Sequence, residues 1–256
     1  MYAQIRRILS DRYTATASRI DWKERMPTAR PADMAAYATP PKNLTTEFDL
    51  PLRERLVPKQ SEVLVPGATP DIAHLLLAGH TCRYRMLQDG RRQITAILVP
   101  GDICDLEALL AGRSSYAVST LTRCTLGDIP LSRYAATHDP ALMAALQRRL
   151  RRDEAIAREW IVSLGRRDGI ERTAHLLCEL RWRLAEVGQA TDDSYELRIT
   201  QHDLADALGL TSVHVNRVLM NLRAERLIHL KGGQLTIIDR PRLQHLAQFD
   251  PAYLMQ

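Results

Sequence analysis

The sequence contains no long apolar run, which argues against a membrane anchor. No stretch approaches the roughly 18 consecutive apolar residues that a transmembrane helix needs. The first residues lack the hydrophobic segment and small-residue cleavage site of a secretory signal. Cysteine is also scarce, and the four cysteines form no CxxC pair: they are Cys82, Cys104, Cys124 and Cys178. This spacing favours reduced thiols over a disulfide framework or a zinc site. We therefore expect a cytoplasmic protein without a membrane partner and without a bound metal.

Motifs of the common enzyme classes are absent as well. The chain has no nucleophile elbow, no metal-binding spacing and no phosphate-binding loop. The enzymatic alternative is a hydrolase that uses Cys104 or Cys178 together with a histidine, and none of these motifs supports it. We expect a protein that is not an enzyme.

The composition is that of an ordinary globular protein with a basic excess. Of the 256 residues, 45% are hydrophobic and 25% are charged, as in folded domains and unlike disordered chains. This length favours two domains, each with its own core. The net charge of +5 favours a polyanionic partner only modestly. Residues 1–45 contain several prolines and more basic than acidic residues, which predicts a flexible, weakly basic arm.

Residues 46–138 alternate short apolar runs with turn signals. Five glycines, at positions 67, 79, 90, 101 and 112, recur at gaps of 12, 11, 11 and 11 residues. Asp89-Gly90 is typical of a hairpin turn, and Pro100-Gly101-Asp102 predicts another turn. Strands are predicted between the turns at 63–65, 72–77, 82–86, 93–98 and 116–121. Strands at such regular spacing favour a compact β-roll or barrel.

Residues 139–166 have a helical period. Positions three and four residues apart form a heptad seam with one polar member, and the seam consists of Met143, Leu146, Leu150, Asp153, Ala157, Trp160 and Leu164. Three heptads are typical of helices that pair between two subunits. The alternative is a long helix packed on its own roll. Beside the seam, four arginines predict a solvated face, with some pairing across the dimer to Asp153 or Glu154: they are Arg148, Arg149, Arg151 and Arg152.

The 40 residues from Thr200 to Asp239 carry the strongest pattern. A second long helix is predicted at 169–187 and a short strand at 195–199. Thr200 can then cap a helix that ends at Gly209, and Thr211 can cap the next helix. Two short apolar strands around Gly232-Gly233 complete a hairpin. This order is typical of a helix-turn-helix followed by a wing.

The outward face of the second helix of this motif mixes residues that can read bases. Opposite its buried stripe lie Val213, Arg217 and Met220, with His214 and Asn216 at the flanks. Arginine pairs with guanine, asparagine pairs with adenine, and an apolar tip contacts the thymine methyl group. The predicted DNA contacts are Thr200, Gln201, Thr211, Ser212, Val213, His214, Asn216 and Arg217. The alternative is a helical hairpin enclosed in a larger core.

This arrangement resembles the Crp/Fnr superfamily of bacterial transcription regulators. The resemblance covers about residues 48–256 and includes LLLAGHTCRYRMLQDGRRQITAILVPGDICDLEALL (75–110), REWIVSLGRRDGIERTAHLLCEL (158–180) and ITQHDLADALGLTSVHVNRVL (199–219). It implies an α+β fold with an N-terminal cyclic-nucleotide-binding-type β-roll (46–138), a long dimerisation helix (139–166) and a C-terminal winged helix-turn-helix (167–256). It further implies a homodimer on a palindromic operator of double-stranded DNA, with RNA polymerase as a partner if the protein is an activator. Arg217 stands where the family's guanine-reading arginine lies, whereas Val213 replaces the usual glutamate.

The effector site of the family is only partly matched. Cyclic-nucleotide binders carry Gly-Glu for the ribose, which Asp105-Leu106 replaces here, and Arg-Ser/Thr-Ala for the phosphate, which Arg113, Ser114 and Ser115 resemble. Glu107 is then the candidate for the ribose contact. No cysteine precedes Cys82, which argues against an iron–sulfur cluster.

We therefore predict no cofactor. A cyclic nucleotide held by Glu107, Arg113, Ser114 and Ser115, or a haem ligated by His74 or His80, are the alternatives. A DNA-organising protein without base specificity remains the alternative function, because it would also use a basic charge.

Overall fold

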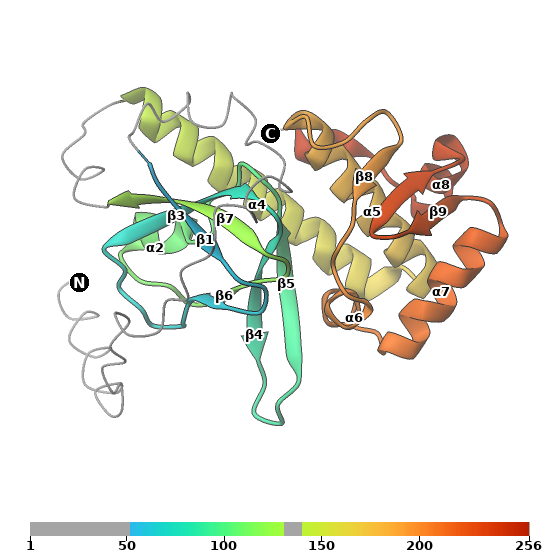
Figure 1. Cartoon of the computed structure of the whole chain (residues 1–256), viewed down its shortest axis with the longest axis horizontal. Coiled ribbons are helices and arrows are strands. Elements are labelled where there is room, and N and C mark those ends of the chain that lie inside the picture. The colour runs from blue at the N-terminus through green and yellow to red at the C-terminus, as the bar shows by residue number, and fades with distance from the viewer. Residues whose placement is uncertain (1–51, 131–139, 256) are drawn as a thin grey trace. The chain divides into compact units, whose positions relative to one another are not determined.

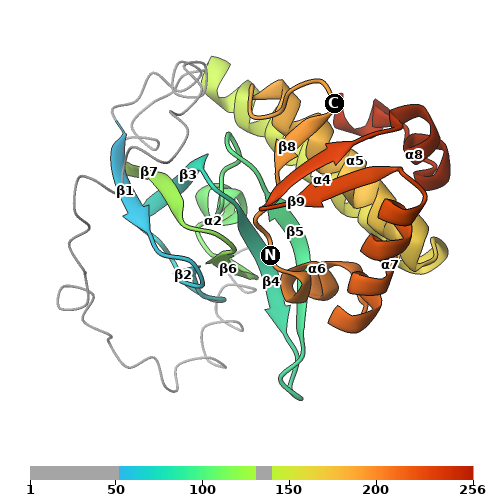
Figure 2. The same ribbon diagram turned by 45° about the vertical axis from the view of Figure 1, so that its right-hand side comes forward.

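A computed structural model describes residues 52–130 and 140–255 of the chain (Figure 1). The predicted arm at 1–45 lies outside the described residues. Within the described ranges, a β-roll is followed by two long helices and a smaller mixed domain (Figure 2). No helix in these ranges is long and apolar enough to cross a membrane.

The roll consists of two antiparallel sheets. One sheet has the order β1-β7-β3, with β1 Arg53–Val57, β7 Cys124–Pro130 and β3 Ile72–Ala78. The other has the order β2-β6-β4-β5, with β2 Glu62–Leu64, β6 Ala117–Thr120, β4 Thr81–Met86 and β5 Arg92–Leu98. A short helix, α2 (Leu106–Ala111), follows β5. The predicted strands are confirmed, with small differences at their ends.

Leu76, Leu98, Val118 and Leu126 are each at most 1% exposed inside the roll. Their burial explains why the apolar runs between the turns become strands. Gly79 makes the turn from β3 to β4 with a φ of 87°. A Cβ atom there would clash with the carbonyl oxygen of Arg123, so this position requires glycine on both grounds.

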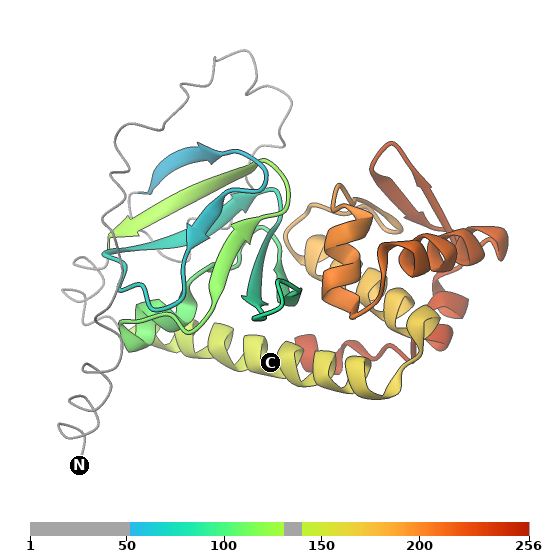
Figure 3. The ribbon, with the colours of Figure 1, turned by 90° about the horizontal axis from the view of Figure 1, so that it is seen from below.

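The long helix α4 (Pro140–Arg166) lies along the roll and is followed by α5 (Gly169–Glu186) (Figure 3). The side chains of Leu142 and Leu146 pack into the apolar cluster of the roll, and Trp160 packs into the C-terminal core. Asp168 begins α5 with a capping box. Its carboxylate accepts from the backbone N–H of Glu171, and the carboxylate of Glu171 accepts from the backbone N–H of Asp168.

The seam predicted for a dimer is therefore partly wrong. Leu146 is 1% exposed and Trp160 is 8% exposed, and Asp153 accepts a hydrogen bond of 2.7 Å from Arg83 of the roll. These three side chains face their own chain, because the roll and α5 cover that side of the helix. Asp153 thus pairs with Arg83 of its own chain and not with one of the four arginines beside the seam, and Glu154 pairs with Arg158 one helical turn away.

The C-terminal domain contains the predicted short strand, helix-turn-helix and wing, followed by two helical segments that the sequence did not predict. Its elements are β8 (Ser194–Glu196), α6 (Gln201–Leu208), α7 (Ser212–Ala224), β9 (Ile228–Lys231), β10 (Gln234–Ile237), α8 (Arg240–Ala247) and the 3₁₀ helix η3 (Pro251–Leu254). The sheet has the order β8-β10-β9. Phe249 and Tyr253 of the C-terminal tail pack around His175 of α5, with ring centroids 5.3 and 5.9 Å from its ring. The C-terminal tail therefore packs back onto α5.

Candidate nucleic-acid interface

The helix α7 presents one exposed and one buried face. Val215, Val218, Leu219 and Leu222 are each at most 2% exposed. On the other side Val213 is 69% exposed and Met220 is 57% exposed, and Ser212, Asn216 and Arg217 are exposed as well. The alternative in which this face is enclosed by the rest of the chain is therefore wrong.

Threonine caps define the N-terminal ends of α6 and α7. The hydroxyl of Thr200 accepts a 3.1 Å hydrogen bond from the backbone N–H of Asp203, and that of Thr211 accepts one of 3.2 Å from His214. Each cap satisfies an N–H that the first helical turn leaves without a partner. Gly209 ends α6 in the left-handed region, with φ 62°, so the chain can turn sharply into α7.

The two helices also contact each other on their exposed side. The Asn216 side chain donates a 3.0 Å hydrogen bond to Oε1 of Gln201. This bond holds the amide of a predicted adenine reader at the N-terminal end of α6. The structure thus brings Gln201, Ser212, Val213, Asn216 and Arg217 to one surface.

His214 has a second role that the sequence did not indicate. A Cβ atom at Gly169, the first residue of α5, would lie 2.8 Å from Nε2 of His214. The imidazole therefore lies against the backbone at the start of α5, and Gly169 provides the room for it. His214 is exposed on α7 and at the same time contacts its own chain.

The wing adds basic residues that sequence reasoning missed. Lys231 is exposed directly before the turn at Gly232-Gly233. The Cγ atom of Arg198 lies 3.0 Å from the position that a Cβ atom would take on Gly233. Lys231 therefore lies beside the tip of the hairpin together with Arg198, whose Nε forms an ion pair with Glu196. A lysine beside a double-glycine turn is the signal that could have found Lys231.

The four residues predicted for an effector pocket lie close together, but three of them satisfy their own polar groups within the chain. The backbone N–H and the hydroxyl of Ser115 donate to Oε2 of Glu107 at 3.1 and 2.8 Å. Ser114 is buried and donates to the carbonyl oxygen of Tyr116 at 2.8 Å. The guanidinium of Arg113 lies against Gly67. Glu107 in α2 and the two serines in the turn after it are therefore already hydrogen-bonded within the chain.

The histidines proposed for a haem do not fit that group. Nδ1 of His74 lies 2.7 Å from the buried carboxylate of Asp105, and its Nε2 lies 3.7 Å from Asp128. His80 is 6% exposed, and burial lowers its pKa to about 4, with the charge of Arg183 as a second cause. Neither ring presents a nitrogen to open space. The described part of the chain also contains no group of three or more metal-ligating side chains.

The four cysteines are buried and free. Burial raises the pKa of the thiol to about 11 in Cys82 and Cys124 and to about 12 in Cys178. The pKa of Cys104 rises further, first through burial and then through the charge of Asp105. Because the thiolate is the nucleophile, these side chains do not support a cysteine hydrolase.

Comparison with known proteins agrees with this geometry. The family model of the cyclic nucleotide-binding domain matches residues 54–137, and that of the Crp-like helix-turn-helix domain matches residues 171–246. The nitrogen fixation regulation protein FixK of Bradyrhizobium diazoefficiens is 32% identical over 175 residues, which span 67% of this chain and 72% of that protein.

The chain belongs to the Crp/Fnr family. Among other relatives of this Crp/Fnr protein, the transcriptional activatory protein AadR of Rhodopseudomonas palustris is 29% identical over 69% of this chain and 74% of its own. The structure of FixK2 from Bradyrhizobium japonicum superposes with a TM-score of 0.67 at 25% identity, covering 77% of this chain and 98% of that chain. A CRP/FNR regulator from Thermus thermophilus, 24% identical with a TM-score of 0.59, shares the fold over 77% of this chain and 99% of its own. The chain is a transcription regulator with a helix-turn-helix DNA-binding domain.

Proposed function

We propose that this Crp/Fnr regulator acts as a homodimer on a palindromic operator, with α7 of each protomer in the major groove. The observation that carries the proposal is the exposed face of α7, where a cation, an amide and an apolar tip stand together. Arg217 pairs with guanine, Asn216 with adenine, and Val213 contacts a thymine methyl group. Thr200, Gln201, Thr211 and Ser212 lie at the N-terminal ends of the two helices, where backbone and hydroxyl groups suit phosphate contacts.

The exposed apolar side chains of α4 supply the surface for the second protomer. Met143 is 39% exposed, Leu150 45%, Ile161 69% and Leu164 37%, and Ala157 is exposed between them. Gln147 and Glu154 complete this surface. Its positions are 143, 147, 150, 154, 157, 161 and 164, and their spacing alternates between four and three residues. That is the spacing of a two-helix seam. We propose this seam in place of the one that includes Leu146, Asp153 and Trp160.

A twofold axis along such a seam would present two copies of α7 to successive major grooves, about 34 Å apart. The operator would then contain two half-sites one DNA turn apart. Because AadR is a named activatory protein, we include contact with RNA polymerase in the proposal.

The proposal is tested by selecting an operator from random DNA with the full chain. The expected product is a palindrome that the protein prefers over unrelated DNA by a factor of about 10³ or more. Sedimentation of the free protein should give the mass of a dimer. Equal binding to all sequences would instead support the alternative of a DNA-organising protein, and a monomer bound to a single half-site would overturn the dimer.

A further inference from the structure

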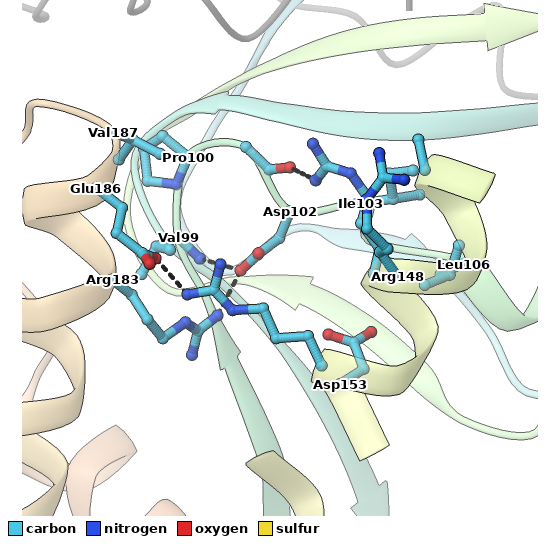
Figure 4. Close-up of a pocket in the computed structure, with 14 residues that line it drawn as sticks. Val99, Pro100, Asp102, Ile103, Leu106, Arg148, Asp153, Arg183, Glu186 and Val187 are labelled. Atoms are coloured by element: carbon cyan, nitrogen blue, oxygen red, sulfur yellow. Dashed lines mark hydrogen bonds and ion pairs between the residues drawn. The ribbon is translucent and has the colours of Figure 1, made fainter. Parts of the chain in front are cut away.

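A pocket of about 360 Å³ lies where the roll, α4 and α5 meet (Figure 4). Its walls come from the turn at residues 99–103, from one side of α4 and from the C-terminal end of α5. None of the four residues predicted for an effector lines it. The charged side chains of the lining are Arg148, Arg149, Arg152, Asp153, Arg183, Asp102 and Glu186.

The acids of the lining are each held by an arginine. Asp102 lies 2.5 Å from Nη2 of Arg183, and Glu186 forms an ion pair with Arg152. Asp153 is held by Arg83, which lies outside the lining. The lining itself therefore carries four arginines against three acids, an excess of one positive charge. The sequence predicts that the arginines of α4 form a solvated face. In the structure, however, Arg149 donates to the Gly101 carbonyl oxygen and Arg152 pairs with Glu186.

The cation at the base of the pocket is fixed in place. The side chain of Arg183 is 3% exposed, and its Nη1 donates to the carbonyl oxygen of Ile97 at 3.0 Å and to Glu179 at 3.1 Å. An arginine held by buried partners loses little freedom when it binds an anion. The remaining wall is apolar and contains Val99, Ile103, Leu106, Ala145 and Val187.

We propose that this pocket binds a small phosphate ester. Guanidinium groups from two helices, Arg148 and Arg152 on α4 and Arg183 on α5, can form paired hydrogen bonds to phosphate oxygens. The apolar wall would then cover the organic part of the ligand, and Asp102 can accept hydrogen bonds from its hydroxyl groups. The volume is at the lower end of the range of ligand pockets, so it suits a sugar phosphate better than a dinucleotide.

Such a ligand would connect the helix that carries the proposed dimer seam to the helix on which α7 packs. The binding itself does not depend on the proposed operator, and it can be measured without DNA.

The test uses isothermal titration of the full chain with ribose 5-phosphate, inorganic phosphate and succinate, each up to about 10 mM. We expect one ribose 5-phosphate per protomer, weaker binding of phosphate and the weakest binding of succinate. The double variant Arg148→Gln/Arg152→Gln should weaken the binding of ribose 5-phosphate at least about tenfold. Arg151→Gln is the matched control, because Arg151 is an exposed arginine of the same helix outside the lining.

A third variant distinguishes loss of the site from loss of the fold. Glu186→Gln removes an acid that competes for Arg152, so it should strengthen binding by about two- to fivefold. The proposal is overturned if none of the probes binds, if the double variant and Arg151→Gln lose the same affinity, or if Glu186→Gln weakens binding. Tighter binding of succinate than of ribose 5-phosphate would overturn the ligand class.

Discussion

The guanidinium of Arg92, on β5 of the roll, lies 2.5 Å from the carboxylate of Asp203 on α6 of the DNA-binding domain. Its Nε also donates to Asp206 of the same helix at 2.7 Å. Asp203 in turn accepts from the hydroxyl of Thr200, the cap of α6. One arginine of the roll thus contacts two carboxylates of the helix that supports α7.

Removing this contact should destabilise the protein. Arg92→Gln leaves two partly buried carboxylates without their cation, so we expect a loss of about 1–2 kcal/mol in the free energy of unfolding. The measurement is urea denaturation at neutral pH. Arg91→Gln is the control. Arg91 pairs with Asp89 in an exposed turn, so its replacement should change the free energy of unfolding little. Equal stability of the two variants would show that the Arg92 contact contributes nothing.

The recognition face makes a prediction about affinity and selectivity together. Arg217→Ala should lose about 1–3 kcal/mol of binding to the selected operator and relax one base position. Arg223 lies near the end of the same helix, where its Nε donates to the Leu219 carbonyl oxygen. Arg223→Ala is therefore the control and should leave the base preference unchanged. Fluorescence anisotropy on the operator and on single-base variants measures both quantities. If the Arg217 variant binds as tightly and as selectively as the parent, the assignment of Arg217 fails.

Val213 offers a change of specificity and not only a loss. Its side chain is 69% exposed, so a glutamate fits there without disturbing the core. Because a carboxylate accepts from cytosine N4 and finds no donor on thymine, Val213→Glu should shift the preferred base at that step from thymine to cytosine. Repeating the operator selection with the variant measures this. An unchanged consensus would mean that residue 213 does not contact bases.

The helix-turn-helix could be predicted from sequence because its signals are local. Thr200, Gly209 and Thr211 each act within four residues of their own position, and the structure has all three as caps. The roll was predicted except for β1, whose sequence RERLV is mostly charged, and β7, which contains glycine, aspartate and proline. These strands are defined by pairing across more than 65 residues, which no local pattern reports.

The seam of α4 shows a different limit. Two heptad registers share positions 143, 150, 157 and 164, and they differ in whether 146, 153 and 160 or 147, 154 and 161 complete them. Periodicity reports an apolar stripe but not what covers it. The roll covers Leu146, and the contact of Arg83 with Asp153 joins residues 70 positions apart. The pair of Arg183 with Asp102 joins residues 81 positions apart, so a local sequence pattern could not predict it either.

The proposed seam predicts the oligomeric state of one variant. Ile161→Lys would place two like charges against each other across a twofold axis in an apolar interface, so it should dissociate the dimer and weaken operator binding. Val162→Lys is the control, since Val162 is also exposed, at 47%, but lies outside the seam. Sedimentation at micromolar concentration distinguishes a monomer from a dimer. A dimer that survives Ile161→Lys and dissociates with Val162→Lys would place the interface elsewhere on α4.

The buried histidine of the roll predicts how stability depends on pH. Burial lowers the pKa of His80 from 6.5 to about 4, so between these values the unfolded chain binds a proton that the folded chain does not. Stability is therefore fully present above about pH 6.5 and is lost as the pH falls towards 4, on the order of 2–3 kcal/mol for this group. His80→Gln keeps the backbone contacts of residue 80, so it should reduce the loss of unfolding free energy between pH 6.5 and pH 4. Urea denaturation of both proteins at pH 7.5, 6 and 5 measures it, and parallel curves for parent and variant would show that His80 is not the titrating group.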